Sequence, residues 1–262
     1  MRLKTGSALG TYSKGNEFSV SINFGLSGGR HCSIDCWHNP NNPDPNAGGD
    51  CYAFRAELRP DRKQLRAKLE RHESMPASRV IGKATLELQD LIRRGKRIDW
   101  ARISTNGSVP LAGSDDFNHL FISQLRAFLS VCKQNDIEVH FPLETEEETE
   151  AYRKVVGDLV VVRESIQNPA DFVHAEGEIS TSIGRGLPLI ERVKLSRDLA
   201  KQRREATGRK AIVCPAVTSS FKLKLTRDPE AKAKAREVAN NSKCGNCTAC
   251  ANRGMDIIYP AH

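Results

Sequence analysis

Short apolar runs alternate with longer amphipathic segments along most of the chain. The short runs combine β-branched and aromatic residues with small polar ones, a composition typical of strands. The run LVVV is apolar throughout, as expected for a strand covered on both faces. On this basis, strands are predicted at residues 19–24, 97–104, 137–141, 159–162, 172–175 and 211–214.

The segments between these runs carry apolar residues at helical spacing. One predicted helix places Ile81, Ala84, Leu88 and Leu91 on a single face. A second covers residues 115–134, with Ser114 and Asp115 as its expected cap. Its predicted buried stripe consists of Phe117, Phe121, Leu125, Phe128 and Cys132.

Two further helices differ in charge. An acidic helix begins near Glu144, and its carboxylates at Glu146, Glu147, Glu148 and Glu150 are expected to form a solvated face. A basic helix is predicted over residues 188–204, and residues 222–241 form a charged, alanine-rich segment that also suits a helix.

Alternating strands and helices predict an α/β fold with a mainly parallel sheet. The order, with one long helical region and then compact repeats, favours a partial (β/α) barrel related to the TIM barrel. The expected domains are residues 1–220, which form the barrel with a loop after its first strand, and residues 221–262, a cysteine-rich extension.

Composition narrows the class of protein. The 262 residues are 39% hydrophobic and carry a formal net charge of +8, which suits a globular protein and is compatible with a nucleic-acid partner. No stretch is long and apolar enough to span a bilayer, and the first residues lack the apolar core of a secretory signal. The expected location is therefore the cytoplasm, where clustered cysteines more often bind metal than form disulfides.

Six of the eight cysteines form two groups. Cys32 and Cys36 are separated by three residues, and Cys51 follows after a loop rich in Asn, Pro and Gly. The second group, near the C-terminus, is Cys244-x-x-Cys247-x-x-Cys250. Such short spacings are used by iron–sulfur clusters, whose irons are bound by thiolates.

Zinc is the alternative metal, because a histidine at position 31, 38 or 262 would complete a tetrahedral site. Cys214 ends an apolar run and precedes a proline, so it is a candidate fourth ligand for the C-terminal group. A buried thiol at a strand end is the other interpretation of Cys214. Cys132 is expected to be a core residue.

A strand followed by Cys-x-x-x-Cys and a third cysteine resembles the radical SAM superfamily. The order Cys32, Cys36, Cys51-Tyr52-Ala53 and the terminal cysteine run also resembles the gene product 88 family of phage proteins. The radical SAM resemblance implies a 4Fe–4S cluster on three cysteines with one iron open to S-adenosylmethionine. It also implies cofactor contacts from Asn106, in the loop after the second predicted strand, and from Arg163, Glu164 and Ser165. A phage origin would place the protein in the host cytoplasm.

Three functions are compatible with these features. The first is a radical-SAM-like enzyme with a second cluster at the C-terminal cysteines. The second is a non-catalytic iron–sulfur protein that binds nucleic acid or a host protein. The third is a zinc-stabilised nucleic-acid-binding module, whose basic surface would include the helix at residues 188–204.

Overall fold

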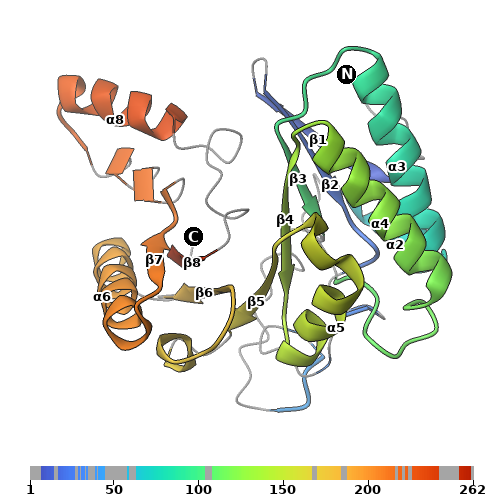
Figure 1. The fold of residues 1–262 in the computed structure, drawn as a ribbon. Helices are drawn as coiled ribbons and strands as arrows, with labels where there is room; N and C mark the ends of the chain where they lie inside the picture. The colour runs from blue at the N-terminus through green and yellow to red at the C-terminus, as the bar shows by residue number, and fades with distance from the viewer. Residues whose placement is uncertain are drawn as a thin grey trace. The chain divides into compact units, whose positions relative to one another are not determined.

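A computed structural model divides the chain into two compact units, Met1–Val162 (unit 1) and Arg163–His262 (unit 2). The structure describes residues 7–14, 17–26, 63–103, 108–166, 170–183, 188–215, 226–241 and 254–260, together with single positions among residues 29–58 and 218–223. Figure 1 shows the elements of both units.

The sheet of unit 1 has the strand order β1-β2-β3-β4. Its strands are β1 (Leu9–Lys14), β2 (Glu17–Ile22), β3 (Trp100–Ile103) and β4 (Glu138–Leu143). β1 is antiparallel to β2, whereas β2, β3 and β4 are parallel. The carboxyl ends of these three strands therefore lie along the same edge.

Four α-helices are described in unit 1: α2 (Lys63–Glu73), α3 (Ala77–Arg93), α4 (His119–Gln134) and α5 (Glu146–Val156). α3 and α4 lie side by side in Figure 1. The predicted apolar face of α3 is confirmed, because Ile81, Ala84, Leu88 and Leu91 are all buried.

The start of α4 differs from the prediction. The Oδ1 atom of Asn118 accepts a hydrogen bond from the backbone N–H of Phe121 at 3.0 Å, so Asn118 caps the helix in place of Ser114 or Asp115. Phe117 consequently precedes the helix and is only partly buried. The other four residues of the predicted stripe are buried.

Aromatic rings form the centre of the unit 1 core. The Tyr152 ring lies edge-on to Phe117, Phe121 and Phe141, with centroids 5.0, 6.3 and 5.3 Å away. Phe24, just after β2, packs edge-on against Phe121 at 5.8 Å. Each such pair contributes roughly 0.5–1.5 kcal/mol beyond the apolar area that it buries. This cluster joins α4 and α5 to the end of β2.

The sheet of unit 2 has the order β5-β6-β8-β7, and all of its pairings are parallel. The strands are β5 (Val162–Ile166), β6 (Ile179–Ile183), β7 (Lys210–Val213) and β8 (Met255–Pro260). Its helices include α6 (Leu189–Thr207), α8 (Pro229–Asn241) and the 3-10 helix η3 (Asp171–Val173). β8 is thus an inner strand, between β6 and β7.

Two predicted strands are wrong. In the run LVVV, Leu159 belongs to the 3-10 helix η2 (Gly157–Leu159), and the strand begins only at Val162. Gly157, the residue after α5, has a φ of 55°, a backbone conformation that favours glycine. Because this conformation is not helical, α5 ends at Val156 and η2 follows. Residues 172–175 overlap η3 and are not a strand. Phe172 is buried there in an apolar cluster of unit 2.

The α/β fold with mostly parallel strands is confirmed, although the strand order is open and does not establish a barrel. The division at Val162 also differs from the domain boundary predicted near residue 220. β8 comes from the predicted extension, yet it pairs with strands on both sides. Within the described residues, no helix is long and apolar enough to cross a membrane.

Candidate metal and cofactor site

Two loops meet at the edge where β2 and β3 end. Cys32 follows β2 and Ser108 follows β3. The hydroxyl of Ser108 donates to the Cys32 sulfur over 3.9 Å, a long contact of the kind that sulfur accepts. Since the strands are parallel and adjacent, this meeting follows from the order of the sheet.

The chain reaches Cys32 through two successive turns. The backbone N–H of Gly29 donates to the carbonyl of Leu26, and the N–H of Cys32 donates to the carbonyl of Gly29, each at 3.0 Å. The Cys32 thiol itself lies 3.8 Å from the Leu26 carbonyl. The position of Cys32 is therefore set by backbone contacts within its own loop.

The last residues of α2 hold the beginning of this loop. Glu73 accepts a hydrogen bond from the Leu26 N–H at 2.9 Å. A Cβ atom on Gly25 or Gly29 would lie 1.8 or 2.6 Å from the Glu73 carboxylate, so both positions require glycine while Glu73 keeps this place. His72 is buried, and its Nδ1 lies 2.6 Å from the Asn23 carbonyl, to which it donates.

A second side-chain pair lies beside the cysteine. His31 is only 3% exposed, and its Nε2 lies 3.7 Å from the Asp116 carboxylate. The other oxygen of Asp116 accepts from the backbone N–H of Ala77, the first residue of α3, at 3.2 Å. Asp116 therefore links His31, the neighbour of Cys32, to the first residue of α3.

The two described thiols of unit 1 differ in availability. Cys32 is partly exposed and forms no disulfide. Cys132 is fully buried in α4, and burial raises the pKa of its thiol to about 12. The prediction that Cys132 is a core residue is confirmed, whereas Cys32 remains accessible to a ligand.

A buried acid near the end of β4 was not predicted. Glu148 is 7% exposed, and burial, with Glu144 and Glu147 nearby, raises the pKa of its carboxyl to about 7. Its backbone N–H donates to the Thr145 hydroxyl, which caps α5. The expectation of a solvated acidic face is wrong at this position, although it holds for Glu146, Glu147 and Glu150.

In unit 2, the three predicted cofactor contacts lie within β5 and not after a strand. Arg163 is fully buried, and its Nη1 donates to the Met255 carbonyl. Glu164 and Ser165 pair with residues of β6 and are partly exposed. A contact of these residues with a ribose or carboxylate stays a prediction, and the position of Arg163 gives it a structural task at the start of β8.

Cys214 directly follows β7 and is 7% exposed. Its backbone N–H donates to the Ile258 carbonyl at 2.8 Å, in the carboxyl half of β8. Met255, where β8 begins, pairs instead with Lys210. A site shared with the cysteine run before β8 would require residues 251–254 to cover the length of about four strand residues, roughly 13 Å.

Several predicted site residues lie outside the described part of the chain: Asn106, Cys36, Cys51, Cys244, Cys247 and Cys250. Of the predicted cysteine ligands, only Cys32 and Cys214 are described, one in each unit. Among the described residues, no group of three or more His, Cys, Asp or Glu side chains could hold a metal ion. The predicted ligand sets therefore stay predictions.

The sequence contains a signal for one contact that was missed. Ser108 lies just after a predicted strand, and loops at the carboxyl ends of neighbouring parallel strands converge. Nothing comparable marks Glu73, whose place at the loop depends on how α2 packs. No family model matches this chain, and neither a curated protein nor a solved structure does.

Proposed function

We propose that this chain is an iron–sulfur protein whose first cluster is bound by Cys32, Cys36 and Cys51, in the manner of radical SAM enzymes. The proposed cluster is of the 4Fe–4S type, with one iron left for S-adenosylmethionine. The proposed fold of the chain is a partial (β/α) barrel, for which the parallel strands β2, β3 and β4 beside Cys32 are the supporting observation.

The observation that carries the proposal is the place of Cys32. It lies beyond the carboxyl end of a parallel strand, where α/β proteins build their sites. Its thiol is partly exposed and forms no disulfide. Two further cysteines follow it in the sequence, and thiolates at short spacing suit iron.

The neighbouring side chains fit a bound thiolate. The Ser108 hydroxyl points its proton toward the Cys32 sulfur, and hydrogen bonds to cluster sulfurs raise the reduction potential. Glu73 accepts from the Leu26 N–H, and Gly25 and Gly29 leave room for its carboxylate, so these residues position the backbone that leads to Cys32. A bound cluster would supply the electron for reductive cleavage of the cofactor, while the protein orients the reactants.

A second cluster at Cys244, Cys247 and Cys250 belongs to the same proposal. Cys214 is its candidate fourth ligand, which requires residues 251–254 to span roughly 13 Å, the length of about four strand residues. The competing function is a zinc or non-catalytic iron–sulfur protein that binds nucleic acid or a host protein through its basic surface, and the experiments below separate it from the enzyme.

The first experiment measures metal content. Protein purified without oxygen and reconstituted is expected to contain iron and acid-labile sulfide. Replacing Cys32, Cys36 and Cys51 together by alanine should remove about four irons per chain if both sites hold 4Fe–4S clusters. The matched control is Cys132→Ala, which should leave the iron content unchanged. Colourless protein that contains zinc and no sulfide would overturn the proposal.

The second experiment tests the cofactor. S-adenosylmethionine added to the reduced protein should change the electron paramagnetic resonance spectrum of the cluster in wild type and in Cys132→Ala. Reduced protein should also release 5′-deoxyadenosine slowly. A cluster whose spectrum is unchanged, with no such product, would support the non-catalytic alternative and reject the enzyme.

A further inference from the structure

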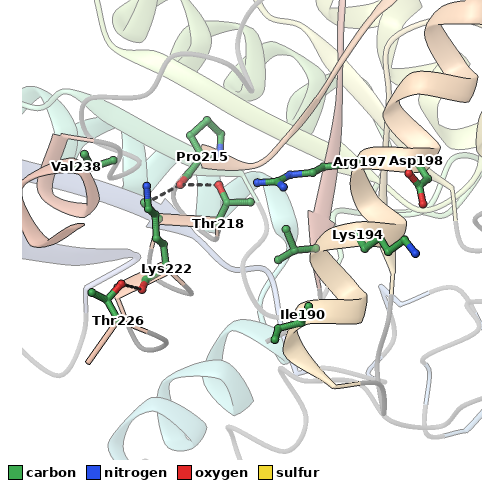
Figure 2. Close-up of a pocket in the computed structure, with 11 residues that line it drawn as sticks. Ile190, Lys194, Arg197, Asp198, Pro215, Thr218, Lys222, Thr226 and Val238 are labelled. Carbon is green, nitrogen blue, oxygen red and sulfur yellow. Dashed lines mark hydrogen bonds between the residues drawn. The ribbon is translucent and has the colours of Figure 1, made fainter. Parts of the chain in front are cut away.

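Unit 2 contains a pocket whose lining includes Pro215, the residue directly after Cys214, but not Cys214 itself. Its volume is about 710 Å³, within the range of small-molecule sites. Three segments line it: the first half of α6, the residues that follow β7, and α8 (Figure 2). The lining residues belong to one compact unit, so the pocket does not depend on the other.

One part of the wall is aliphatic. Ile190 and Val193 of α6, Pro215 after β7 and Val238 of α8 line the pocket. Ile190 and Val238 are 69% and 49% exposed, which is high for large apolar side chains. Two such side chains at the same cavity offer an apolar ligand surface that the protein itself leaves in water.

Another part of the wall is cationic. Lys194, Arg197 and Lys222 line the pocket together with a single acid, Asp198. Figure 2 shows the Arg197 guanidinium directed from α6 toward Pro215 and Thr218, while Asp198 extends to the other side. Within the described part of the chain, none of the three cations forms an ion pair. The pocket therefore has an excess of uncompensated positive charge.

The basic residues nearer the end of α6 are different. Arg203 donates to the Asp256 carboxylate at 3.0 Å and is fully buried. Lys201 lies 3.7 Å from Glu205 on the exposed surface. Arg197 has no such partner in the described residues, although Asp198 is its immediate neighbour in the sequence.

The hydroxyl groups of the pocket are already used as donors. Thr218 donates to the carbonyls of Cys214 and Pro215 at 3.0 and 3.2 Å, and Thr226 donates to the carbonyl of Lys222 at 2.7 Å. These oxygens still accept hydrogen bonds, but their protons are not available to a ligand. Recognition of an anion is thus left to the guanidinium and ammonium groups.

We propose that this pocket binds an amphipathic organic anion, with a phosphate or carboxylate group between Arg197 and Lys222 and an aliphatic body against Ile190, Val193 and Val238. A guanidinium suits a phosphate or carboxylate because it donates two parallel hydrogen bonds. The aliphatic wall supplies the rest of the affinity. This inference is independent of any cluster.

The surface of α6 disfavours a nucleic acid as the ligand. Glu191, Asp198 and Glu205 recur every seven residues along the helix, beside the cations. A phosphate backbone that follows the helix would meet these carboxylates, whereas a single anionic group in the pocket meets only Asp198. The described pocket lining also has no aromatic side chain on which a base would stack.

The test is calorimetric titration of the intact protein with octyl phosphate, kept below its critical micelle concentration. Wild type is expected to bind one molecule, and Arg197→Gln should weaken binding about tenfold or more, as expected for the loss of a charged hydrogen-bonding partner. Ile190→Ser should weaken it several-fold through the aliphatic wall. The matched control is Lys201→Gln, which removes a cation of the same helix outside the pocket and should change affinity less than twofold.

Three results would overturn the inference. They are the absence of octyl phosphate binding, equal affinity for inorganic phosphate, and equal weakening by Lys201→Gln and Arg197→Gln. Displacement of octyl phosphate by a single-stranded oligonucleotide, with similar losses in both variants, would assign the face to nucleic acid instead. Far-ultraviolet circular dichroism of each variant separates loss of binding from loss of fold, and Lys222→Gln provides a second pocket variant if Arg197→Gln does not fold.

Discussion

The two units bury their ionisable side chains in different ways. Unit 1 has a large continuous apolar core, and its buried titratable groups can become neutral. Burial lowers the pKa of His72 and raises that of Glu148 to about 7. Unit 2 has smaller apolar clusters, yet it buries Arg163, Arg203 and Asp256 completely.

An arginine does not lose its charge in a protein, so each buried guanidinium of unit 2 needs a carboxylate or carbonyl that accepts its hydrogen bonds. Asp256 accepts from Arg203 at 3.0 Å, from Arg209 at 3.1 Å and from the backbone N–H of Ile179 at 3.2 Å. The Arg203 guanidinium also donates to the Val173 carbonyl and lies 5.6 Å from the centre of the Phe172 ring. One carboxylate thus joins α6, β6 and β8, a task that apolar packing performs in unit 1.

The largest expected effect is at this carboxylate. Asp256→Asn leaves Arg203 buried against a neutral amide, and breaking a buried ion pair costs about 3–5 kcal/mol. Hydrogen exchange is expected to lose protection in β6, β7, β8 and α6, and denaturant unfolding should report a loss of this size. The control is Asp171→Asn, at an exposed residue of η3, which should change stability by less than about 0.5 kcal/mol. A loss below about 1 kcal/mol at position 256 would contradict this view of unit 2.

Leucine truncations compare the two apolar cores. Leu125 is fully buried in the large cluster of unit 1, and Leu125→Ala should cost roughly 2–5 kcal/mol through lost burial and a cavity. Leu199 is 8% exposed in the smaller cluster of unit 2, where Leu199→Ala is expected to cost less. Leu120→Ala, at a side chain 60% exposed, serves as the control in the same denaturation series. Equal losses at positions 125 and 199 would show that the apolar cores contribute alike.

The smallest expected effect concerns the pH dependence of unit 1. Because the pKa of Glu148 rises from 4.5 to about 7 on folding, the folded protein holds this proton more tightly than the unfolded chain. Its contribution to stability is therefore present below pH 4.5 and is lost as the pH rises to about 7. Glu148→Gln should remove this part of the pH dependence and stabilise the protein above pH 7 by roughly 1–2 kcal/mol, after allowance for solvent screening.

Denaturant midpoints measured from pH 4.5 to pH 8 check this expectation. Glu150→Gln, at an exposed position of the same helix, should keep the wild-type profile. An unchanged slope in Glu148→Gln would mean that the carboxyl is solvated in the folded protein.

The spacing of apolar residues along the sequence predicted the helices whose apolar face packs against many other core residues. Phe121, Leu125 and Phe128 recur at helical spacing, and all three are buried in the core of unit 1. This spacing predicts α4 because burial of one apolar face stabilises a helix. β8 was missed even though Ile257 and Ile258 are fully buried, because its neighbours in the sequence are polar and cysteine-rich. Its identity as a strand depends on β6 and β7, which are distant along the chain.

The candidate site was predictable to a similar degree. The order of a strand and a cysteine loop identified the edge at which Cys32 lies. The burial of Glu148 could also have been predicted, since Tyr152 and Val156 follow it at four-residue spacing and share its side of α5. The burial of Arg163 has no local signal, because its hydrogen-bond acceptor, the Met255 carbonyl, is far away in the sequence.

The inner position of β8 has a consequence for synthesis on the ribosome. Domains tend to fold as their residues emerge, beginning with the N-terminal ones. β6 and β7 are not neighbours in the sheet, and each pairs with β8, which is translated after both. Unit 1 can complete its sheet as soon as β4 has emerged, whereas unit 2 must wait for residues 255–260 with the edges of β6 and β7 unpaired. During that interval the strand edges of β6 and β7 that will face β8 lack their hydrogen-bond partners, which is the condition under which strand edges pair with other chains.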